Sequence, residues 1–496
     1  MKLSLVLERS GVKPPEQDPE ITSITNDSRT AGPGSLFFAM PGARTDGNLF
    51  IGQALEKGAA AVVSASGIPA GLRSRFPQAV LLIAPDLAPA LSRTAANLHG
   101  WPSRKMKMFG ITGTKGKTTS AYLLESVLRK AGGRPGVIGT IDYRVDGKVL
   151  AAAANTTPFA HTLQELLARM AAADALTAVM EVSSHALALG RADDVDFDVA
   201  AFTNLQRDHL DFHGDRENYF RAKARIFELL ERSCKKDKCA VINLDDERAP
   251  ALLKMVKGKL RALTFGIDKE ADVRAGDVEI LENVTRFTLK HGGEALPVKL
   301  RLLGRHNVCN ALAAAASALA GGYSLRACAD GLEALANVPG RLERVDLGQD
   351  YAVFVDYAHT DAALENVLSN LKLMPHNRII TVFGCGGDRD RTKRGPMGRV
   401  SCSMSDSVIV TSDNPRTEDP ARIFADIEAG IKDEFRNYEL IPDRGEAIGK
   451  AIASAMKGDI ILIAGKGHEA YQILKDRTIH FSDAEAAAAA IRGRGA

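Results

Sequence analysis

A glycine-rich loop that leads into Lys117 and Thr118 is the segment of this sequence best suited to bind a chain of phosphates. It lies between an apolar run, residues 106–111, and a stretch, residues 120–130, whose apolar side chains recur at helical spacing. In a strand, loop and helix of this kind, backbone N–H groups surround the phosphates, the lysine reaches the terminal ones and the threonine can bind magnesium. Gly110 stands one residue before the first glycine of the strict GxxxxGK[ST] pattern. The loop predicts ATP or GTP, and leaves motor, kinase, transporter and ligase open.

Three further side chains could take part in phosphate chemistry. Glu181 lies near the end of an apolar run, residues 176–182, where a carboxylate can hold magnesium between phosphates. By position alone it could equally be a surface cap, and His209 a loop histidine. Lys223 lies in a helical stretch, where a lysine is ordinarily solvated. The residue types alone therefore leave these three roles open.

The elements that must position these residues alternate strand-like and helix-like runs. A chain of 496 residues is too long for one hydrophobic core and predicts about three domains. We predict boundaries that give an N-terminal α/β domain at residues 1–101, a central domain at 102–337 and a C-terminal domain at 338–496. The central domain is predicted to contain a mostly parallel sheet with an antiparallel patch between residues 261 and 303. The C-terminal domain is predicted to be doubly wound and Rossmann-like, with a final helix in its Ala-rich tail.

Composition excludes several classes of protein. Hydrophobic residues make up 45% and charged residues 25%, as in an ordinary globular protein. The net charge of +3 argues against bulk nucleic-acid binding. The first ten residues do not have the pattern of a signal peptide, and the longest small-apolar run, residues 311–320, is too short to span a membrane. The six cysteines contain no CxxC pair and are predicted to be reduced thiols in a cytoplasmic protein. A zinc site at Cys234 and Cys239 would need two more ligands, which no nearby His or Cys pair supplies.

Nine segments in a fixed order resemble the Mur ligase family over nearly the whole chain. The first is the variant phosphate loop, residues 112–119, with the sequence TGTKGKTT. The other eight are Asp27-Ser28-Arg29, Asn155-Thr156-Thr157-Pro158, Glu181-Val-Ser-Ser-His185, Asn204-Leu-Gln-Arg-Asp-His209-Leu-Asp211, Gly304-Arg-His-Asn307-Val-Cys-Asn310, Asp356-Tyr-Ala-His359, Asp413-Asn-Pro-Arg416 and Gly465-Lys-Gly-His-Glu469.

The resemblance implies an ATP-dependent ligase of peptidoglycan precursor synthesis. Members of this type add meso-2,6-diaminopimelate to UDP-N-acetylmuramoyl-L-alanyl-D-glutamate. They pass the γ-phosphate of ATP to the substrate carboxylate, and the incoming amine attacks the acyl phosphate. Positioning and neutralisation of charge by lysine and Mg²⁺ would do most of the catalytic work. The implied architecture, with uridine-nucleotide, ATPase and amino-acid-binding domains, agrees with the boundaries given above.

The resemblance also implies roles for individual residues. The catalytic set would be Lys117, Glu181, His209 and Lys223, with Thr118, Glu181, His209 and Lys223, as a carbamate (N6-carboxylysine), binding Mg²⁺. ATP would be bound by Gly113, Thr114, Lys115, Gly116, Lys117, Thr118, Thr119, Asn307, Asn310, Arg341 and Asp356. The UDP-linked dipeptide would contact Ser28, Asn155, Thr156, Thr157, Ser183 and Arg191. Without the resemblance, the residues of this last set would be read as turn and cap residues.

The acceptor amino acid is implied by the last domain. Arg416 follows a predicted strand, and a guanidinium suits bidentate recognition of a carboxylate. Diaminopimelate carries a distal carboxylate that L-lysine lacks, and a site built for it can reject lysine by a factor of about 10⁴–10⁵. The pocket implied by the resemblance consists of Arg389, Asp413, Asn414, Pro415, Arg416, Gly465 and Glu469.

Three positions depart from the usual pattern of the family. Lys115 stands where Asn is common, Leu189 where Gln often contacts substrate, and Asp361 where Pro often follows His359-Thr360. None removes a residue that the chemistry requires, so we expect an active enzyme. The alternatives are a lysine-adding or other Mur-type ligase, and a nucleotide-switched assembly protein that would hydrolyse ATP without the other substrates. The oligomeric state is not constrained by the sequence, and a monomer is the working expectation.

Overall fold

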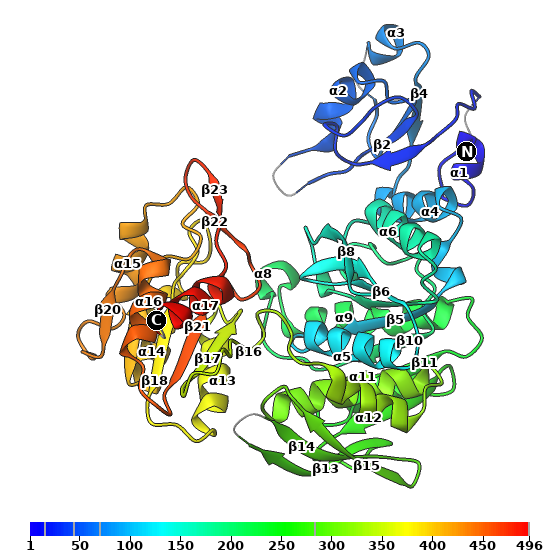
Figure 1. Ribbon diagram of the computed structural model, residues 1–496. Coiled ribbons are helices and arrows are strands. Elements are labelled where there is room, and N and C mark those ends of the chain that lie inside the picture. The colour runs from blue at the N-terminus through cyan, green and yellow to red at the C-terminus, as the bar shows by residue number, and fades with distance from the viewer. Residues whose placement is uncertain (14–15, 43–44, 69–70, 282–283, 495–496) are drawn as a thin grey trace. The chain divides into compact units, whose positions relative to one another are not determined.

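The computed structural model describes residues 1–13, 16–42, 45–68, 71–281 and 284–494 of the protein (Figure 1). The chain divides into two compact units. Unit 1 comprises residues 1–277, 288–298 and 308–334, and unit 2 comprises residues 278–287, 299–307 and 335–496. The domain boundaries predicted at residues 101 and 337 remain predictions.

Unit 1 begins with a parallel four-stranded sheet in the order β1-β2-β3-β4. Every residue of β2 and β3 is buried, as expected for parallel strands covered on both faces. The strands are β1 (Ser23–Thr25), β2 (Ser35–Ala39), β3 (Ala61–Ser64) and β4 (Val80–Ile83). The helices of this part are α1 (Leu3–Val6), η1 (Gly47–Phe50), α2 (Ile51–Glu56), α3 (Leu72–Arg75), α4 (Leu87–Leu98) and η2 (Pro102–Lys105).

A second sheet has eleven strands in the order β15-β14-β13-β12-β11-β10-β5-β9-β6-β7-β8. Its strands are β5 (Lys107–Thr112), β6 (Pro135–Ile138), β7 (Asp142–Val145), β8 (Lys148–Ala152), β9 (Thr177–Glu181), β10 (Val199–Phe202), β11 (Cys239–Asn243), β12 (Arg261–Gly266), β13 (Val273–Ile280), β14 (Thr285–His291) and β15 (Glu294–Leu300). The strand β5 pairs in parallel with β9 and β10, and β6 pairs in parallel with β9. Parallel strands place their carboxyl ends at one edge, so the loops after β5, β6, β9 and β10 converge there.

The first strand of the predicted antiparallel patch, β12, is an exception to that prediction. The strand β12 is parallel to both β11 and β13, so an antiparallel patch does not begin at residue 261. The later strands of the predicted patch, β13, β14 and β15, are neighbours at one edge of the sheet, and at the other edge β7 is antiparallel to both β6 and β8. β12 is exposed at its start and mostly buried at its end, and so short a strand does not reveal its direction from sequence pattern alone.

Helices cover the second sheet. Those after β5 are α5 (Lys117–Lys130), α6 (Ala160–Ala172), α7 (Ser184–Ala188), α8 (Leu210–His213), α9 (Arg216–Arg232), α10 (Ala249–Val256), α11 (Arg305–Ala320) and α12 (Leu325–Ala334). The helix α5 packs on α12, where the Ser126 hydroxyl donates to the Gly331 carbonyl at 2.7 Å (Figure 1). A side chain at Gly331 would place its Cβ 2.3 Å from Cα of Val127, so the two helices approach closely only because this residue is glycine.

Unit 2 contains a six-stranded sheet in the order β16-β17-β21-β18-β19-β20. All its pairs are parallel except β16 with β17. Its strands are β16 (Glu343–Arg344), β17 (Ala352–Asp356), β18 (Ile379–Phe383), β19 (Ser407–Val410), β20 (Tyr438–Leu440) and β21 (Ile460–Ala464), and a separate hairpin joins β22 (Tyr471–Ile473) to β23 (Thr478–His480). The helices are α13 (Asp361–Lys372), α14 (Arg394–Met404), α15 (Pro420–Glu428), α16 (Arg444–Ser454) and α17 (Asp483–Arg494).

Two separate apolar clusters fill the two faces of the unit 2 sheet. One includes Leu364 of α13 and Met397 of α14, and the other includes Ile448 of α16 and Ile491 of α17. Helices therefore cover both faces, and the α/β, doubly wound fold predicted from the sequence is confirmed. The Ala-rich tail is helical, as predicted, and Ala487 and Ile491 are its buried residues of apolar type.

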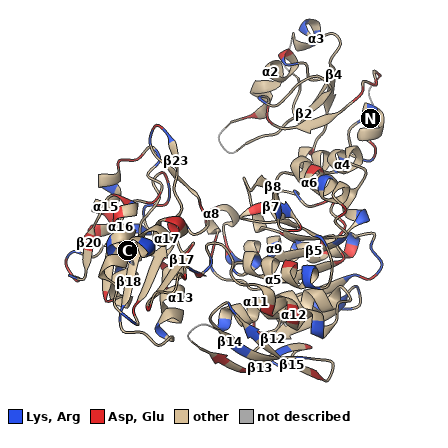
Figure 2. Cartoon of the chain, viewed as in Figure 1, with Lys and Arg blue, Asp and Glu red and all other residues tan. Residues whose placement is uncertain are grey.

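Charged residues of both signs are interspersed along the elements, in keeping with the net charge of +3 (Figure 2). Among the described residues, no helix is long and apolar enough to cross a membrane. All six cysteines are free.

Candidate active site

The phosphate loop connects β5, an interior strand of the eleven-stranded sheet, to α5. The Lys117 ammonium folds back over the loop and donates to the carbonyl oxygens of Gly113, at 2.9 Å, and Thr114, at 3.0 Å. Gly116 has φ of 86°, and a Cβ there would lie 2.2 Å from Oδ1 of Asn310. Glycine is required at this position for both its backbone conformation and its packing. The predicted strand, loop and helix are all present, with Thr118 and Thr119 in the first turn of α5.

The segment after β10 holds the backbone of this loop. Lys115 N donates to Oδ1 of Asn204 at 3.0 Å, and Nδ2 of Asn204 donates to the Lys115 carbonyl at 3.0 Å. The Thr203 hydroxyl donates to the same carbonyl at 2.7 Å. These contacts satisfy the loop's own polar groups and fix its shape before any nucleotide binds.

Glu181 lies at the end of β9 among hydroxyl groups. Its Oε2 accepts from the hydroxyls of Thr118, at 2.8 Å, and Thr140, at 3.0 Å, while Oε1 accepts from Thr140 N at 2.9 Å. The Thr156 hydroxyl lies 3.1 Å from that of Thr140. The carboxylate and hydroxyls form an all-oxygen donor set beside the phosphate loop, which is the chemistry that Mg²⁺ prefers, so these residues fit the ion that the sequence implies. Thr140 was missed at the sequence level, since nothing in its local sequence links it to Glu181.

The described contacts of His209 are with residues outside this oxygen cluster. It has φ of 51°, its backbone N donates to Oδ1 of Asp208, and its ring contacts the rings of His185 and Tyr219 at centroid distances of 4.9 and 6.2 Å. Among the described residues, no group of three or more His, Cys, Asp and Glu side chains is arranged to hold a metal ion. His209 as a magnesium ligand therefore stays a prediction.

Lys223 is buried, in contrast to an ordinary helical lysine. Its side chain from α9 reaches the phosphate loop, where Nζ donates to the Gly113 carbonyl at 2.7 Å and lies 4.6 Å from the centroid of the Tyr219 ring. Burial holds the pKa of Lys223 well below its ordinary value, and the positive charge of Lys117 lowers it further. A lysine with so low a pKa has a larger neutral fraction and is correspondingly more reactive as a nucleophile.

The residues predicted to bind the UDP-linked dipeptide fall in two places. Ser28 follows β1 in the first sheet, and its hydroxyl donates to Oε1 of Gln53 at 2.6 Å. The others gather near Glu181: Thr157 donates to the Glu181 carbonyl at 2.8 Å, Ser183 N donates to Thr157 Oγ1 at 3.0 Å, and Arg191 donates to the Thr157 carbonyl at 3.0 Å. The exposed Asn155 accepts a bond from Tyr143 through its backbone carbonyl.

Arg191 has spare hydrogen-bonding capacity. Its Nε is buried and has no hydrogen-bond partner among the residues that the structure describes, and its guanidinium lies over the Phe159 ring, with Cζ 4.3 Å from the centroid. Burial lowers the pKa of Arg191. A buried donor without a partner is costly, and an anionic or carbonyl group of a substrate would satisfy it.

The residues predicted to bind the nucleoside lie on α11 and beside β17. Asn310 lies against the phosphate loop in unit 1, with its Oδ1 close to Gly116. Asn307 lies in unit 2, where its Nδ2 donates to the Leu303 carbonyl at 2.8 Å. Asp356 closes β17 and accepts from Leu342 N at 2.7 Å, and Arg341 lies over the Tyr357 ring, with Cζ 5.3 Å from the centroid. Arg341 and Asp356 are thus brought together through the adjoining residue Leu342.

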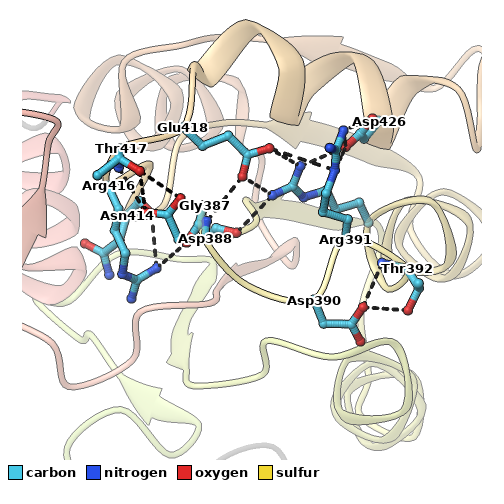
Figure 3. A network of polar contacts seen from close by, with 12 residues as sticks. Gly387, Asp388, Asp390, Arg391, Thr392, Asn414, Arg416, Thr417, Glu418 and Asp426 are labelled. Carbon is cyan, nitrogen blue, oxygen red and sulfur yellow. Dashed lines mark hydrogen bonds and ion pairs between the residues drawn. The ribbon is translucent and has the colours of Figure 1, made fainter. Parts of the chain in front are cut away.

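The predicted amino-acid pocket is built in unit 2 from the carboxyl ends of β21, β18 and β19, which are neighbouring parallel strands. Nδ2 of Asn414 donates to Oε2 of Glu469 at 2.8 Å. Gly465, with φ of 118°, approaches Asp413 so closely that a Cβ would lie 2.8 Å from Oδ2 of that residue. Arg416 donates to the Gly387 carbonyl at 2.9 Å, and Figure 3 shows its side chain in this network. The structure therefore brings together Asp413, Asn414, Arg416, Gly465 and Glu469, and their role in binding an amino acid stays a prediction.

Arg389 and Pro415, the other two members of the predicted pocket, do not share the contacts of the first five. Arg389 is exposed, and within the described part of the chain its side chain has no hydrogen bond or ion pair. Pro415 contributes its carbonyl, which lies 2.0 Å from the position a Cβ would take at Gly387. The two loops of the pocket are therefore in tight contact at this point.

Lys466 is a pocket residue that sequence reasoning did not select. Its side chain is fully buried, and Nζ donates to Oδ1 of Asn414 at 3.2 Å and to Oε2 of Glu469 at 3.4 Å. Burial lowers its pKa, and the carboxylates of Asp413 and Glu469 act in the opposite direction. Its position within the Gly465 to Glu469 motif was the available signal.

The comparison with known proteins supports the same family at every level. Residues 111–318 match the Mur ligase middle domain, residues 340–467 the Mur ligase, glutamate ligase domain, and residues 20–78 the Mur ligase family, catalytic domain. The chain is 45% identical over 476 residues to the UDP-N-acetylmuramoyl-L-alanyl-D-glutamate--2,6-diaminopimelate ligase of Solibacter usitatus, which covers 96% of this chain and 94% of that protein. It is 43% identical over 478 residues to the ligase of the same name from Syntrophomonas wolfei, with 96% of each chain covered.

A solved structure of a ligase with this name also superposes over the full length. Its TM-score is 0.70 at 33% sequence identity, with 100% of both chains covered. The resemblance read from nine ordered motifs is thus confirmed, and the chain belongs to the Mur ligase family.

Proposed function

We propose that this enzyme joins meso-2,6-diaminopimelate to UDP-N-acetylmuramoyl-L-alanyl-D-glutamate with cleavage of ATP to ADP and phosphate, as a step in peptidoglycan precursor synthesis. The observation that carries this is the full-length likeness to ligases named for these two substrates. The pocket of unit 2 supports it, because an arginine, an amide and a carboxylate there suit an amino acid with charged groups at both ends.

The chemistry proceeds through two transfers. A carboxylate oxygen of the dipeptide attacks the γ-phosphorus of ATP, the bond from that phosphorus to the bridging oxygen breaks, and ADP leaves. The diaminopimelate amine then attacks the carbonyl carbon of the acyl phosphate, loses a proton, and phosphate leaves as the amide forms. Lys117 is the cation positioned to neutralise charge on the transferring phosphoryl group, and the backbone of the glycine loop orients the phosphates.

Mg²⁺ would be held by Thr118 and Glu181, with Thr140 orienting the Glu181 carboxylate. The ion supplies neutralisation of phosphate charge when bound. His209 and Lys223 are proposed as additional ligands on the strength of the family resemblance.

Lys223 is proposed to be carbamylated. Carbamate formation requires a neutral amine, which attacks the carbon of CO₂ and loses a proton to leave an N-carboxylate. The low pKa and complete burial of Lys223 support this, since both favour the neutral amine. The carbamate would replace a cation beside the Gly113 carbonyl by an oxygen ligand for Mg²⁺.

The remaining assignments follow from the same resemblance. Arg191 and the residues around Thr157 are proposed to hold the dipeptide, and Ser28 the uridine diphosphate. Asn307, Asn310, Arg341 and Asp356 are proposed to bind the nucleoside of ATP. The enzyme is proposed to act in the cytoplasm, where ATP and nucleotide-linked precursors are found.

The deciding experiment measures phosphate release and product mass with ATP, Mg²⁺ and the UDP-linked dipeptide, and compares meso-diaminopimelate with L-lysine as acceptor. We expect phosphate release and tripeptide product only with diaminopimelate. Product with lysine alone would retain the ligase and overturn the acceptor. Phosphate release that is indifferent to both amino acids would instead identify a nucleotide-switched ATPase.

A further inference from the structure

Two loops of unit 2 meet at the predicted carboxylate-binding arginine. The loop after β18 supplies Gly387 N, which donates to the Asn414 carbonyl at 2.9 Å, and the Gly387 carbonyl accepts from Nη1 of Arg416 at 2.9 Å (Figure 3). Arg416 has φ of 54°, in the left-handed region that residues with a side chain rarely adopt. Such a backbone conformation persists only where its surroundings hold it, so the contacts that fix the two loops also determine where the guanidinium lies.

A buried ion pair joins the start of α14 to the loop that follows β19. Arg394, at the start of α14, is fully buried and donates from Nη1 to Oε1 of Glu418 at 2.8 Å and from Nη2 to Oε2 at 2.7 Å. This is the two-bond geometry that fixes a carboxylate most rigidly. The hydrogen bonds from Arg394 hold the pKa of Glu418 down at about 2, so the carboxylate is ionised at any physiological pH.

Glu418 connects this pair to both loops. It lies two residues after Arg416, and its Oε2 also accepts from Asp388 N, in the opposite loop, at 3.2 Å. The Asp388 carboxylate in turn accepts from Thr417 N at 3.0 Å and from the Thr417 hydroxyl at 2.9 Å. Arg416 is therefore flanked in sequence by a residue, Thr417, that is bonded across to the facing loop, and then by Glu418, which is bonded to Arg394.

We infer that Arg394, Glu418 and Asp388 are positioning residues that set the Arg416 guanidinium for the distal carboxylate of the acceptor, and so contribute to acceptor specificity. This inference rests on the proposed function. Arg394 has a second partner, Asp426 of α15, at 2.8 Å from Nη1, and Asp426 bonds only to Arg391 and Arg394 among its described side-chain contacts. Asp426 stabilises Arg394 and contacts the loop after β18 only at Arg391, next to α14, whereas Glu418 bonds to Asp388 beside Gly387. Asp426 is therefore a control for the loss of one bond to Arg394.

The test compares Glu418→Gln with Asp426→Asn in the full-length enzyme, with each substrate varied in turn. For Glu418→Gln we expect a rise of about tenfold or more in KM for diaminopimelate, since an ångström of misplacement at a positioned group has effects of this size. The KM values for ATP and for the UDP-linked dipeptide should stay within about twofold of wild type. A rise confined to the diaminopimelate KM would separate mispositioning of Arg416 from partial unfolding, which would not raise one KM alone. The preference for diaminopimelate over lysine should fall by the same factor as the diaminopimelate KM rises.

For Asp426→Asn we expect a lower thermal midpoint with the diaminopimelate KM unchanged. An equal rise of that KM in both variants, or no rise in Glu418→Gln, would overturn the inference. If Glu418→Gln does not fold, Thr417→Val replaces it, because the Thr417 side chain is exposed and its loss removes only the bonds to Asp388. We expect a several-fold rise in the diaminopimelate KM there, and an unchanged KM would be equally decisive against the inference.

The wild-type enzyme separates this inference from the proposed function. A wild type that makes no product with diaminopimelate refutes the proposed function, and this inference with it. A wild type that uses diaminopimelate, together with a Glu418→Gln variant of normal KM, refutes the inference alone.

Discussion

Lys117 and Lys223 donate hydrogen bonds to the same carbonyl oxygen, that of Gly113, at 2.9 and 2.7 Å. One lysine opens the helix that follows the phosphate loop, and the other comes from α9, more than a hundred residues later in the chain. Two ammonium groups at one acceptor repel each other, and the site favours a state in which Lys223 carries no positive charge.

The low pKa of Lys223 predicts a pH dependence of stability in the unmodified protein. The unfolded lysine titrates near its ordinary value of 10.5 and the folded one well below it. Between these two values the unfolded state binds the extra proton, so the free energy of unfolding should rise with pH through this window. Below the folded pKa both states are protonated and this contribution to the slope vanishes.

Urea unfolding in CO₂-free buffer would measure that slope. We expect Lys223→Met to lack the rise that wild type shows as the pH increases towards the ordinary lysine value, whereas Lys130→Met, at the exposed end of α5, should keep it. Identical slopes in wild type and Lys223→Met would mean that the amine is not held neutral.

Replacing Lys117 by alanine should lower the turnover number by at least about 10²-fold, because it removes the charge that we propose acts on the transferring phosphoryl group. Phosphate release under saturating substrates is the measurement, with circular dichroism to check that the fold is intact. Lys130→Ala, on the same helix, should retain normal turnover. Near-normal turnover in Lys117→Ala would exclude this loop as the site of phosphoryl transfer.

Arg416→Ala should lose use of diaminopimelate while ATP affinity is nearly unchanged, because the guanidinium lies in the proposed amino-acid pocket of unit 2. Isothermal calorimetry with ATP and steady-state kinetics with diaminopimelate measure the two effects separately. Arg422→Ala, an exposed arginine on α15, should alter neither. A parallel loss of ATP binding would assign Arg416 to the nucleotide site instead.

Asp483→Ala should destabilise unit 2 by about 3–5 kcal/mol, since it leaves a buried guanidinium without its counter-charge. Asp483 and Arg444 are both fully buried and joined by two bonds of 2.7 Å. The neighbouring pair of Glu485 and His480 is exposed, so Glu485→Gln should change the free energy of unfolding by less than about 1 kcal/mol. Guanidinium unfolding followed by a probe in unit 2 compares the two, and equal effects would contradict the buried-pair argument.

The sequence by itself determined the features that depend on neighbouring residues. The phosphate loop could be read directly because its strand, glycines, lysine and helix are contiguous. The apolar runs at residues 106–111 and 176–182 match β5 and β9 to within one residue at each end. The family could be inferred because the nine short motifs, and their order along the chain, can be read without knowing the fold. The final helix could be read from a local cap and a run of strong helix formers.

The tertiary structure alone decided which distant residues meet. Thr140 reaches Glu181 because β6 and β9 are neighbours in the sheet, and Lys466 reaches Asn414 because β21 and β19 flank β18. Helical spacing marked Lys223 as a solvated side chain, whereas the packing of α9 on the sheet buries it. Strand order and helix packing bring residues from far apart in the chain to one edge of a sheet, and local propensity carries no record of that order. The contacts that tune the site therefore become visible only in the folded chain.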